Sequence, residues 1–168
     1  MKPYFIIYIS LVFLSQTILA KEIPQIIEID HPETILFVGN SYLYYNDSLH
    51  NHFKRIVEEY NTDFDGGDSV KSSTIGGSRL KHHDVERLIK PKAISSIEKF
   101  ELIILQGGSA EPLSEDNREE FSFFAKKHID AIKAKDSQAA LYMTHAYVKP
   151  HKRFEKNQIR VIEDTYTK

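Results

Sequence analysis

The chain has 168 residues, of which 41% are hydrophobic and 27% are charged, and it contains no cysteine. Its formal net charge of −2 at pH 7 gives no basic footprint for nucleic acid, so we expect no nucleic-acid partner. Because a chain without cysteine forms no disulfides, its stability must come from packing.

The first twenty residues have the pattern of a secretory signal peptide. Lys2 supplies a small positive start, the run from Tyr4 to Leu19 is almost wholly apolar, and the small residue Ala20 follows it. This run is short for a membrane span, which needs roughly 20 apolar residues. We therefore predict cleavage after Ala20, a secreted or periplasmic protein without a stable membrane span, and one domain over residues 21–168.

The stretch around which the chain is organised begins with four consecutive apolar residues, Ile35–Val38, which predict a buried strand. Gly39-Asn40-Ser41 ends this strand, and a helical pattern resumes at about Leu49. Ligands bind at the carboxyl ends of strands in open α/β sheets, so Ser41 is placed where a nucleophile can be presented. The alternative is that Ser41 caps the next helix and that the preceding residues are a simple turn.

Strands and helices alternate along the remaining sequence. The predicted strands are Val70–Ile75, Leu102–Leu105 and Ala139–Met143. The predicted helices run from a cap at Asp47 or Ser48 to Tyr60, over Arg79–Lys90, over about Glu115–Lys135 and over Phe154–Thr165, and residues 61–68 are predicted to form a turn. One apolar face is expected to hold Phe53, Ile56, Val57 and Tyr60. This alternation predicts an α/β fold with a parallel sheet and right-handed crossovers.

Three of the predicted strands end in small, turn-forming residues: Gly39-Asn40-Ser41, Gly76-Gly77-Ser78 and Gln106-Gly107-Gly108-Ser109. Because parallel strands end at the same edge of a sheet, we expect these three blocks to meet. An acyl-transfer site needs a nucleophile, a base and donors for the developing oxyanion. Ser41 suits the nucleophile, and its own N–H, the N–H of Gly77 and the amide of Gln106 suit the donors.

These blocks resemble the SGNH (GDSL-like) hydrolases, a family of secreted or cytoplasmic esterases and lipases, over about residues 34–147. Phe37–Tyr42 is similar to the first block of the family, with Asn40 where many members carry Asp, and Ile75–Ser78 is similar to the second. The third block of the family usually contains Gly-x-Asn, whereas Leu105–Ser109 looks like a branch with Leu-Gln-x-x-Ser. The third oxyanion donor is therefore Gln106 or, alternatively, Ser109.

The resemblance implies a three-layer α/β/α sandwich with strand order 2-1-3-4. It also implies a serine ester hydrolase that acts through a Ser41 acyl-enzyme on a small-molecule or carbohydrate ester, with lipids also allowed. The last block of the family, Asp-x-x-His, supplies the base and its orienting carboxylate, and no such pattern follows Met143. We therefore expect a C-terminally incomplete domain that lacks a fifth strand, associates through its open edge at Ala139–Met143 and is a poor esterase.

The histidines give no second motif. Asp47–His50 matches Asp-x-x-His but lies in the first helix, so we interpret the match as coincidental. His145 follows the fourth strand and is expected to line the pocket, whereas His82 and His83 are expected to be exposed polar residues. No pair of histidines has metal-ligand spacing with a carboxylate nearby, so we predict no metal and no cofactor.

Two other functions remain open from the sequence. The first is a non-catalytic protein on the same fold, in which the edge of the sheet only binds a ligand. The second is a different α/β domain that receives a phosphate at its glycine-rich strand ends. The glycine runs match neither Gly-x-Gly-x-x-Gly nor the P-loop spacing, which makes the phosphate site the weakest of the three hypotheses.

Overall fold

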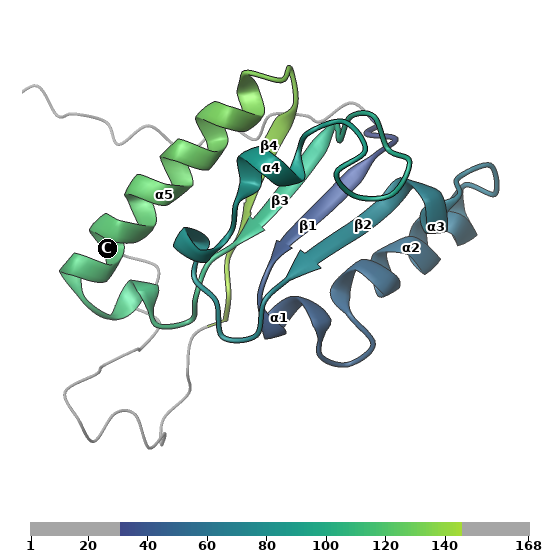
Figure 1. The fold of residues 1–168 in the computed structure, drawn as a ribbon. Coiled ribbons are helices and arrows are strands. Elements are labelled where there is room, and N and C mark those ends of the chain that lie inside the picture. Colours follow the sequence, from purple (N-terminus) through teal and green to yellow (C-terminus); the bar gives the residue numbers. More distant parts are fainter. Residues whose placement is uncertain (1–30, 146–168) are drawn as a thin grey trace, which may run out of the picture.

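The computed structural model describes residues 31–145, which form a four-stranded, all-parallel sheet with helices on both faces (Figure 1). The strands are β1 (Ile35–Gly39), β2 (Val70–Thr74), β3 (Leu102–Gln106) and β4 (Gln138–Tyr142), in the order β2-β1-β3-β4. The α/β class and this strand order are confirmed. The predicted signal peptide, fifth-strand position and helix at Phe154–Thr165 lie outside the described residues.

The central strand β1 is the most apolar and is completely buried. It pairs with β2 on one side and with β3 on the other, so that Phe37 lies opposite Ser72 and Ile104. Successive side chains of a strand point to opposite faces of the sheet. Leu36 and Val38 accordingly enter the core beneath α5, whereas Phe37 packs on the α2 side.

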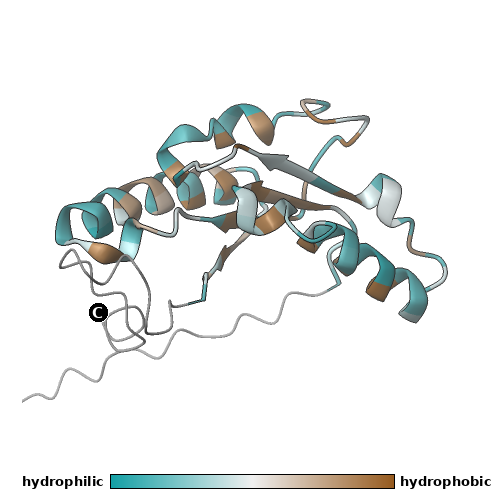
Figure 2. Cartoon of the chain, turned by 90° about the horizontal axis from the view of Figure 1, so that it is seen from below, coloured by the Kyte–Doolittle hydropathy of each residue, from teal (hydrophilic) through white to brown (hydrophobic). Residues whose placement is uncertain are grey.

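Helices cover the sheet on both faces (Figure 2). One layer consists of α1 (Ser41–Tyr44), α2 (Leu49–Tyr60) and α3 (Gly66–Ser69), and the other consists of α4 (Val85–Leu88) and α5 (Glu115–Lys133). The longest helix, α5, begins at the predicted residue because the Ser114 hydroxyl accepts the N–H of Asn117 at 3.3 Å. It buries Ala125, His128 and Ile132 against the sheet.

The predicted helix over Arg79–Lys90 is wrong. Two short elements take its place, the 3₁₀ turn η1 (Leu80–His82) and the one-turn helix α4. The break follows from Asp84, whose carboxylate accepts the N–H of Arg87 at 3.1 Å and so starts a new helix. Between the two elements His83 is extended, with φ −101° and ψ 128°, and its side chain is buried rather than exposed as predicted.

The helix α2 is less deeply buried against the sheet than α5. Ser48 occupies the predicted cap position of α2, but its side chain makes no cap hydrogen bond, and Asp47 instead pairs with Arg55 at 2.7 Å. No residue of α2 is fully buried, and Ile56 and Tyr60, predicted on its apolar face, are 70% and 91% exposed. The predicted turn over residues 61–68 also differs, because α3 begins within it at Gly66.

The strand β4 forms one border of the sheet within the described residues. Its last residues and the one after them expose apolar side chains, at 49% for Leu141, 38% for Tyr142 and 69% for Met143. Within residues 31–145, the structure has no helix whose length and hydropathy would suit a membrane span.

Candidate functional site

The site begins where β1 meets α1. β1 ends at Gly39, and the side-chain oxygen of Asn40 accepts the N–H of Tyr42 at 3.1 Å, which caps α1. Ser41 is the first residue of that helix and is half-buried. Since Asn40 rather than Ser41 makes the cap, the hydroxyl of Ser41 is not used for capping.

Asn40 joins the three strand ends that the sequence predicts to meet. Its N–H donates to the side-chain oxygen of Gln106 at 2.8 Å, and its amide nitrogen donates to the carbonyls of Ser78 at 2.8 Å and Gly107 at 3.3 Å. The residue is only 3% exposed. Because buried polar groups are costly unless they are paired, this network fixes the blocks after β1, β2 and β3 relative to one another.

Gly77 lies in the open part of the loop after β2. It has a φ of +67°, a left-handed conformation that glycine adopts without strain, and a Cβ at this position would meet nothing within 4 Å. The loop is tied to β1, because the N–H of Ile75 donates to the carbonyl of Gly39 at 3.0 Å. In the described part of the chain no hydrogen bond engages the N–H of Ser41 or of Gly77.

The side chain of Gln106 is buried inside the protein and does not lie on the solvent-exposed side of this edge of the sheet. Its side chain is fully buried, its oxygen accepts from Asn40 and its amide nitrogen donates to the carbonyl of Gly107. A Cβ on Gly39 would come within 2.6 Å of the Gln106 oxygen, so only glycine allows this close approach. Gln106 therefore holds the ends of β1 and β3 together, and Ser109 is half-buried further along the same loop.

Two side chains that the sequence did not single out, Ser78 and His83, form a hydrogen-bonded pair in the loop after β2. The Ser78 hydroxyl donates to the Gly39 carbonyl at 3.3 Å and lies 2.8 Å from Nε2 of His83. With the serine proton directed at the carbonyl, Nε2 of His83 carries the proton of this second bond. Burial, together with the smaller effects of the nearby His128 and His82, lowers the pKa of His83 to about 4, so the ring is neutral at neutral pH.

Glu111 is a second buried group that the sequence did not single out. It is 3% exposed, and the backbone N–H groups of Gly108 and Leu80 donate to its carboxylate. Burial raises the pKa of Glu111, although these N–H groups and the charge of Arg79 oppose the shift. The side chain bridges the loops that follow β2 and β3. Only the three-dimensional contact reveals this role, because no local pattern marks it.

Two histidines considered in the sequence have different surroundings. His50 packs on the α2 face, where its Nε2 lies 3.4 Å from the Ser72 hydroxyl and its ring lies 6.3 Å from that of Phe37. The Asp47–His50 match is thus part of the α2 packing. His145 instead reaches the site edge, where its ring centroid lies 5.4 Å from that of Tyr42 in an edge-on arrangement.

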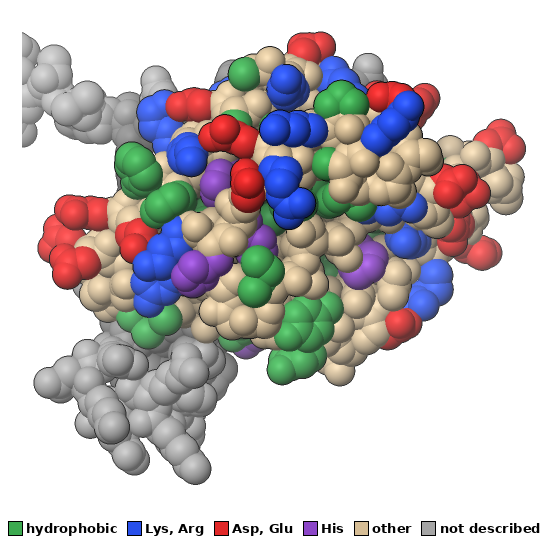
Figure 3. Space-filling model, in the orientation of Figure 1, with side chains coloured by type: hydrophobic (Ala, Val, Ile, Leu, Met, Phe, Trp, Pro, Cys, Tyr) green, Lys and Arg blue, Asp and Glu red, His purple; other side chains and the backbone are tan. Residues whose placement is uncertain are grey.

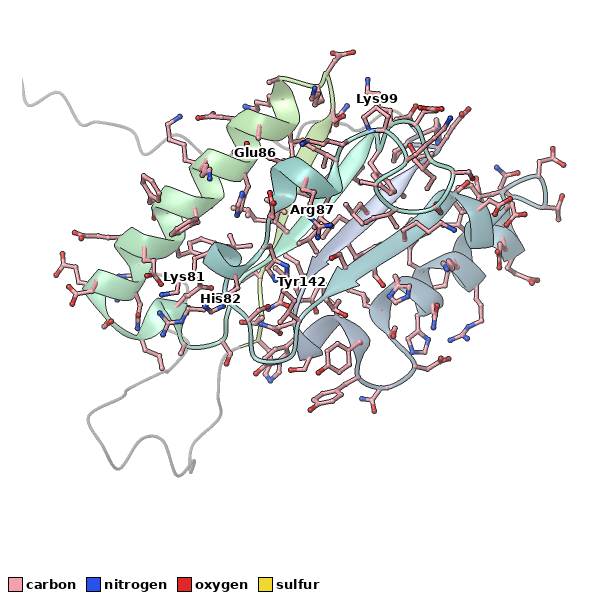
Figure 4. The ribbon with its side chains drawn as sticks, viewed as in Figure 1. Lys81, His82, Glu86, Arg87, Lys99 and Tyr142 are labelled. Atoms are coloured by element: carbon pink, nitrogen blue, oxygen red, sulfur yellow. The ribbon has the colours of Figure 1, made fainter. Side chains whose placement is uncertain are left out.

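Two hollows on the surface of residues 31–145 lie away from Ser41. A hollow of about 590 Å³ lies at the amino ends of the strands and is lined by residues that include Glu33, Lys99 and Glu101. A second hollow of about 260 Å³ lies between η1, α4 and α5 and is lined by residues that include His83 and His128. Figure 4 places Lys99 at the end of the sheet opposite Tyr142, Lys81 and His82. Among residues 31–145 no group of three or more potential ligands is arranged to hold a metal ion.

Comparison of the chain with protein-family models, with curated proteins and with solved structures finds no match. A functional assignment therefore depends on the geometry of the site and on the motifs that led to it. That geometry consists of a serine at a strand–helix junction, an open left-handed glycine in the loop after the neighbouring strand β2, and a buried polar network that joins the two loops.

Proposed function

We propose that the protein is a serine ester hydrolase in which Ser41 is the nucleophile. The observation that carries the proposal is the set of hydrogen bonds from Asn40 to Gln106, Ser78 and Gly107, which ties three strand ends together next to Ser41. A strand–turn–helix junction presents a serine in this way in other hydrolases. The resemblance of the three blocks to SGNH hydrolases supports the same assignment.

In the proposed reaction, the Ser41 oxygen attacks the acyl carbon of an ester, and the alcohol leaves to give an acyl-enzyme that water hydrolyses. The N–H groups of Ser41 and Gly77 are the donors to the oxyanion, because both lie at the carboxyl edge of the sheet and neither donates to another group within residues 31–145. Gln106 contributes by holding Asn40, and thereby Ser41, in place. A small-molecule or carbohydrate ester is the proposed substrate, and export through residues 1–20 would place the enzyme outside the cytoplasm.

The test is covalent labelling of the purified protein with a fluorophosphonate, followed by peptide mass spectrometry. We expect one modified residue, Ser41, and loss of labelling in Ser41→Ala. Ser122→Ala is the matched control, because Ser122 is an exposed serine of α5 that lies outside the site. Labelling that persists in Ser41→Ala, or that is lost in Ser122→Ala, would contradict the proposal.

A non-catalytic binding protein is the second candidate, and one observation favours it. Tyr45 is 67% exposed and packs edge-on against Tyr44 at 5.2 Å beside the site. Figure 3 shows hydrophobic side chains gathered over α1. Exposed aromatic rings can bind a ligand without catalysing a reaction on it. An unreactive Ser41 in a protein that still binds esters through these tyrosines would favour this candidate.

A further inference from the structure

We propose that His83 is a positioning residue, which acts through Ser78 to hold the N–H of Gly77 where the oxyanion forms. This inference rests on the proposed function, in which Gly77 is one of the two oxyanion donors. It extends the site to a buried side chain that lies outside the three strand-end blocks and contacts one of them.

The turn that carries Gly77 needs an anchor from outside. Gly77 is the third residue of a tight turn, Ile75–Ser78, which is closed by a hydrogen bond from the Ser78 N–H to the Ile75 carbonyl at 3.1 Å. Its φ of +67° is the conformation that one common class of β-turn requires at its third residue. Since a Cβ at Gly77 would meet nothing within 4 Å, packing around this residue does little to hold the turn.

Ser78 ties this turn to the loop that carries Ser41. Its hydroxyl donates to the Gly39 carbonyl at 3.3 Å, and its own carbonyl accepts the amide nitrogen of Asn40 at 2.8 Å. These bonds join the residue after Gly77 to the two residues before Ser41. The orientation of the buried Ser78 therefore sets the position of the Gly77 N–H relative to the nucleophile.

His83 fixes the hydroxyl of Ser78. Its Nε2 lies 2.8 Å from the hydroxyl oxygen and donates to it, because the serine proton is directed at the Gly39 carbonyl. The bond to Gly39 is long for an O–H donor, so by itself it holds the hydroxyl weakly. His83 reaches Ser78 because the chain leaves the helical path between η1 and α4.

The type of residue at position 83 also favours a functional role over simple packing. Among residues 31–145 the second ring nitrogen of His83, Nδ1, is buried and has no hydrogen-bond partner. An unsatisfied buried polar atom lowers stability, and an apolar side chain of similar size would avoid this loss. Active sites commonly retain groups that lower stability because the reaction needs them.

The experiment measures how the rate of Ser41 labelling depends on fluorophosphonate concentration. The phosphonyl oxygen gains negative charge only as its phosphorus bonds to Ser41, so a misplaced donor lowers the maximal rate and leaves the half-maximal concentration little changed. In His83→Leu we expect the maximal rate to fall by about 10²-fold, the effect of a misplacement of about 1 Å. His83→Gln should keep most of the rate, since its amide nitrogen can donate to Ser78.

His128→Leu is the matched control. His128 is likewise a buried histidine without a partner for Nδ1 in the described part of the chain, but its Nε2 bonds to the Leu80 carbonyl at 3.1 Å rather than to Ser78. We expect His128→Leu and His83→Leu to be similarly stable in urea. Only His83→Leu should label slowly.

Ser78→Ala tests the route of the effect, because it removes the hydroxyl and leaves the backbone bonds of Ser78 in place. We expect the same fall in the maximal rate as in His83→Leu. The double variant should show no further fall, since residues that act through one shared contact are not additive. Effects that multiply in the double variant would overturn the action through Ser78.

The remaining outcomes separate this inference from the proposed function. Labelling at the wild-type rate in both His83→Leu and Ser78→Ala would overturn the role of His83 and leave Ser41 as the nucleophile. Equal slowing in His128→Leu, or no difference between His83→Gln and His83→Leu, would also overturn it and assign His83 to stability alone. A wild-type protein whose Ser41 does not react would contradict the proposed function, and with it any part of His83 in the reaction.

Discussion

The two ends of the same four strands differ in how their polar groups are arranged. At the carboxyl ends, four buried polar residues, Asn40, Ser78, Gln106 and Glu111, bond to one another's loops and backbone. At the amino ends, the larger hollow of about 590 Å³ is lined mainly by charged and polar residues. The comparison teaches that the larger hollow and the buried polar network lie at opposite ends of the sheet, and that only the network holds several loops in one costly arrangement.

The contacts at the amino ends are weak by comparison. The Glu101 carboxylate accepts the N–H of Glu33 at 2.6 Å, but this contact is exposed to solvent. The pair between Lys99 and Asp136 spans 3.4 Å, with side chains that are 45% and 104% exposed. Because water screens such pairs, they contribute little to stability. The difference between the two ends leads to three predictions that begin with the largest effect.

The replacement Asn40→Asp should be strongly destabilising, even though many members of the family that the chain resembles carry Asp there. Asn40 donates to the carbonyls of Ser78 and Gly107 at 2.8 and 3.3 Å, and a carboxylate would face both with negative charge. An unpaired buried charge costs about 4 kcal/mol, so the free energy of unfolding should fall by about that amount. Urea denaturation at neutral pH measures it.

Two controls sharpen this prediction. Asn40→Ala removes the same donors without adding a charge, and we expect it to cost about 2 kcal/mol. Glu101→Gln makes a charge change of the same size but opposite sign at the exposed amino end, and it should stay within about 0.5 kcal/mol of the wild type. Equal losses for Asn40→Asp and Glu101→Gln would show that the two ends do not differ as described.

Acid should lower the free energy of unfolding through protonation of His83, which lies near the carboxyl ends of the strands. The ordinary pKa of histidine applies in the unfolded chain, whereas burial lowers the pKa of folded His83 to about 4 from 6.5. The unfolded chain therefore binds the proton first as the pH falls. The contribution of neutral His83 to the free energy of unfolding is fully present above pH 6.5 and is lost as the pH falls through 4. The loss amounts to up to about 3 kcal/mol.

The variant His83→Gln tests this dependence, and the slope of stability against pH between 6.5 and 4 should become smaller. It should not vanish, because burial also lowers the pKa values of His128 and His50. Glu111 acts in the opposite direction: burial raises its pKa, so its contribution is present at low pH and is lost as the pH rises. Thermal melts across this range provide the measurement, and an unchanged slope in His83→Gln would contradict the assignment.

The smallest effect is expected from Lys99→Ala at the amino end. The lysine pairs with Asp136 across 3.4 Å in an exposed position, and such pairs are worth less than about 1 kcal/mol. We expect a change within about 0.5 kcal/mol in the free energy of unfolding and no change in Ser41 labelling. A loss of labelling here would show that the amino end contributes to the site.

Much of the fold could be predicted because its signals are local. The apolar run at Ile35–Val38 and the cap at Ser114 determine β1 and the start of α5 through contacts within a few residues. The prediction of one helix over Arg79–Lys90 was wrong, and the apolar spacing of Leu80, Val85 and Leu88 gives no sign of the break. His83 leaves the helical path to reach Ser78, and Asp84 then caps a new turn.

The site was predicted less completely, because its main contacts are long-range. Gly77 and Ser41 could be singled out from glycine-rich strand ends, and the structure places both at the same edge of the sheet. The roles of Asn40, Ser78 and Glu111 depend on partners in other loops, which no spacing in the sequence reveals. Gln106 was singled out for its amide, yet its full burial follows from the close approach of Gly39.

The bonds of Asn40 also bear on the order in which the molecule assembles. They join Asn40 to Ser78, which is 38 positions further along the chain, and to Gly107, which is 67 positions further along. Contacts of such high sequence separation form slowly, because loop closure must precede them. Ser41 therefore reaches the surroundings that it has in the folded protein only after three separate strand segments have come together.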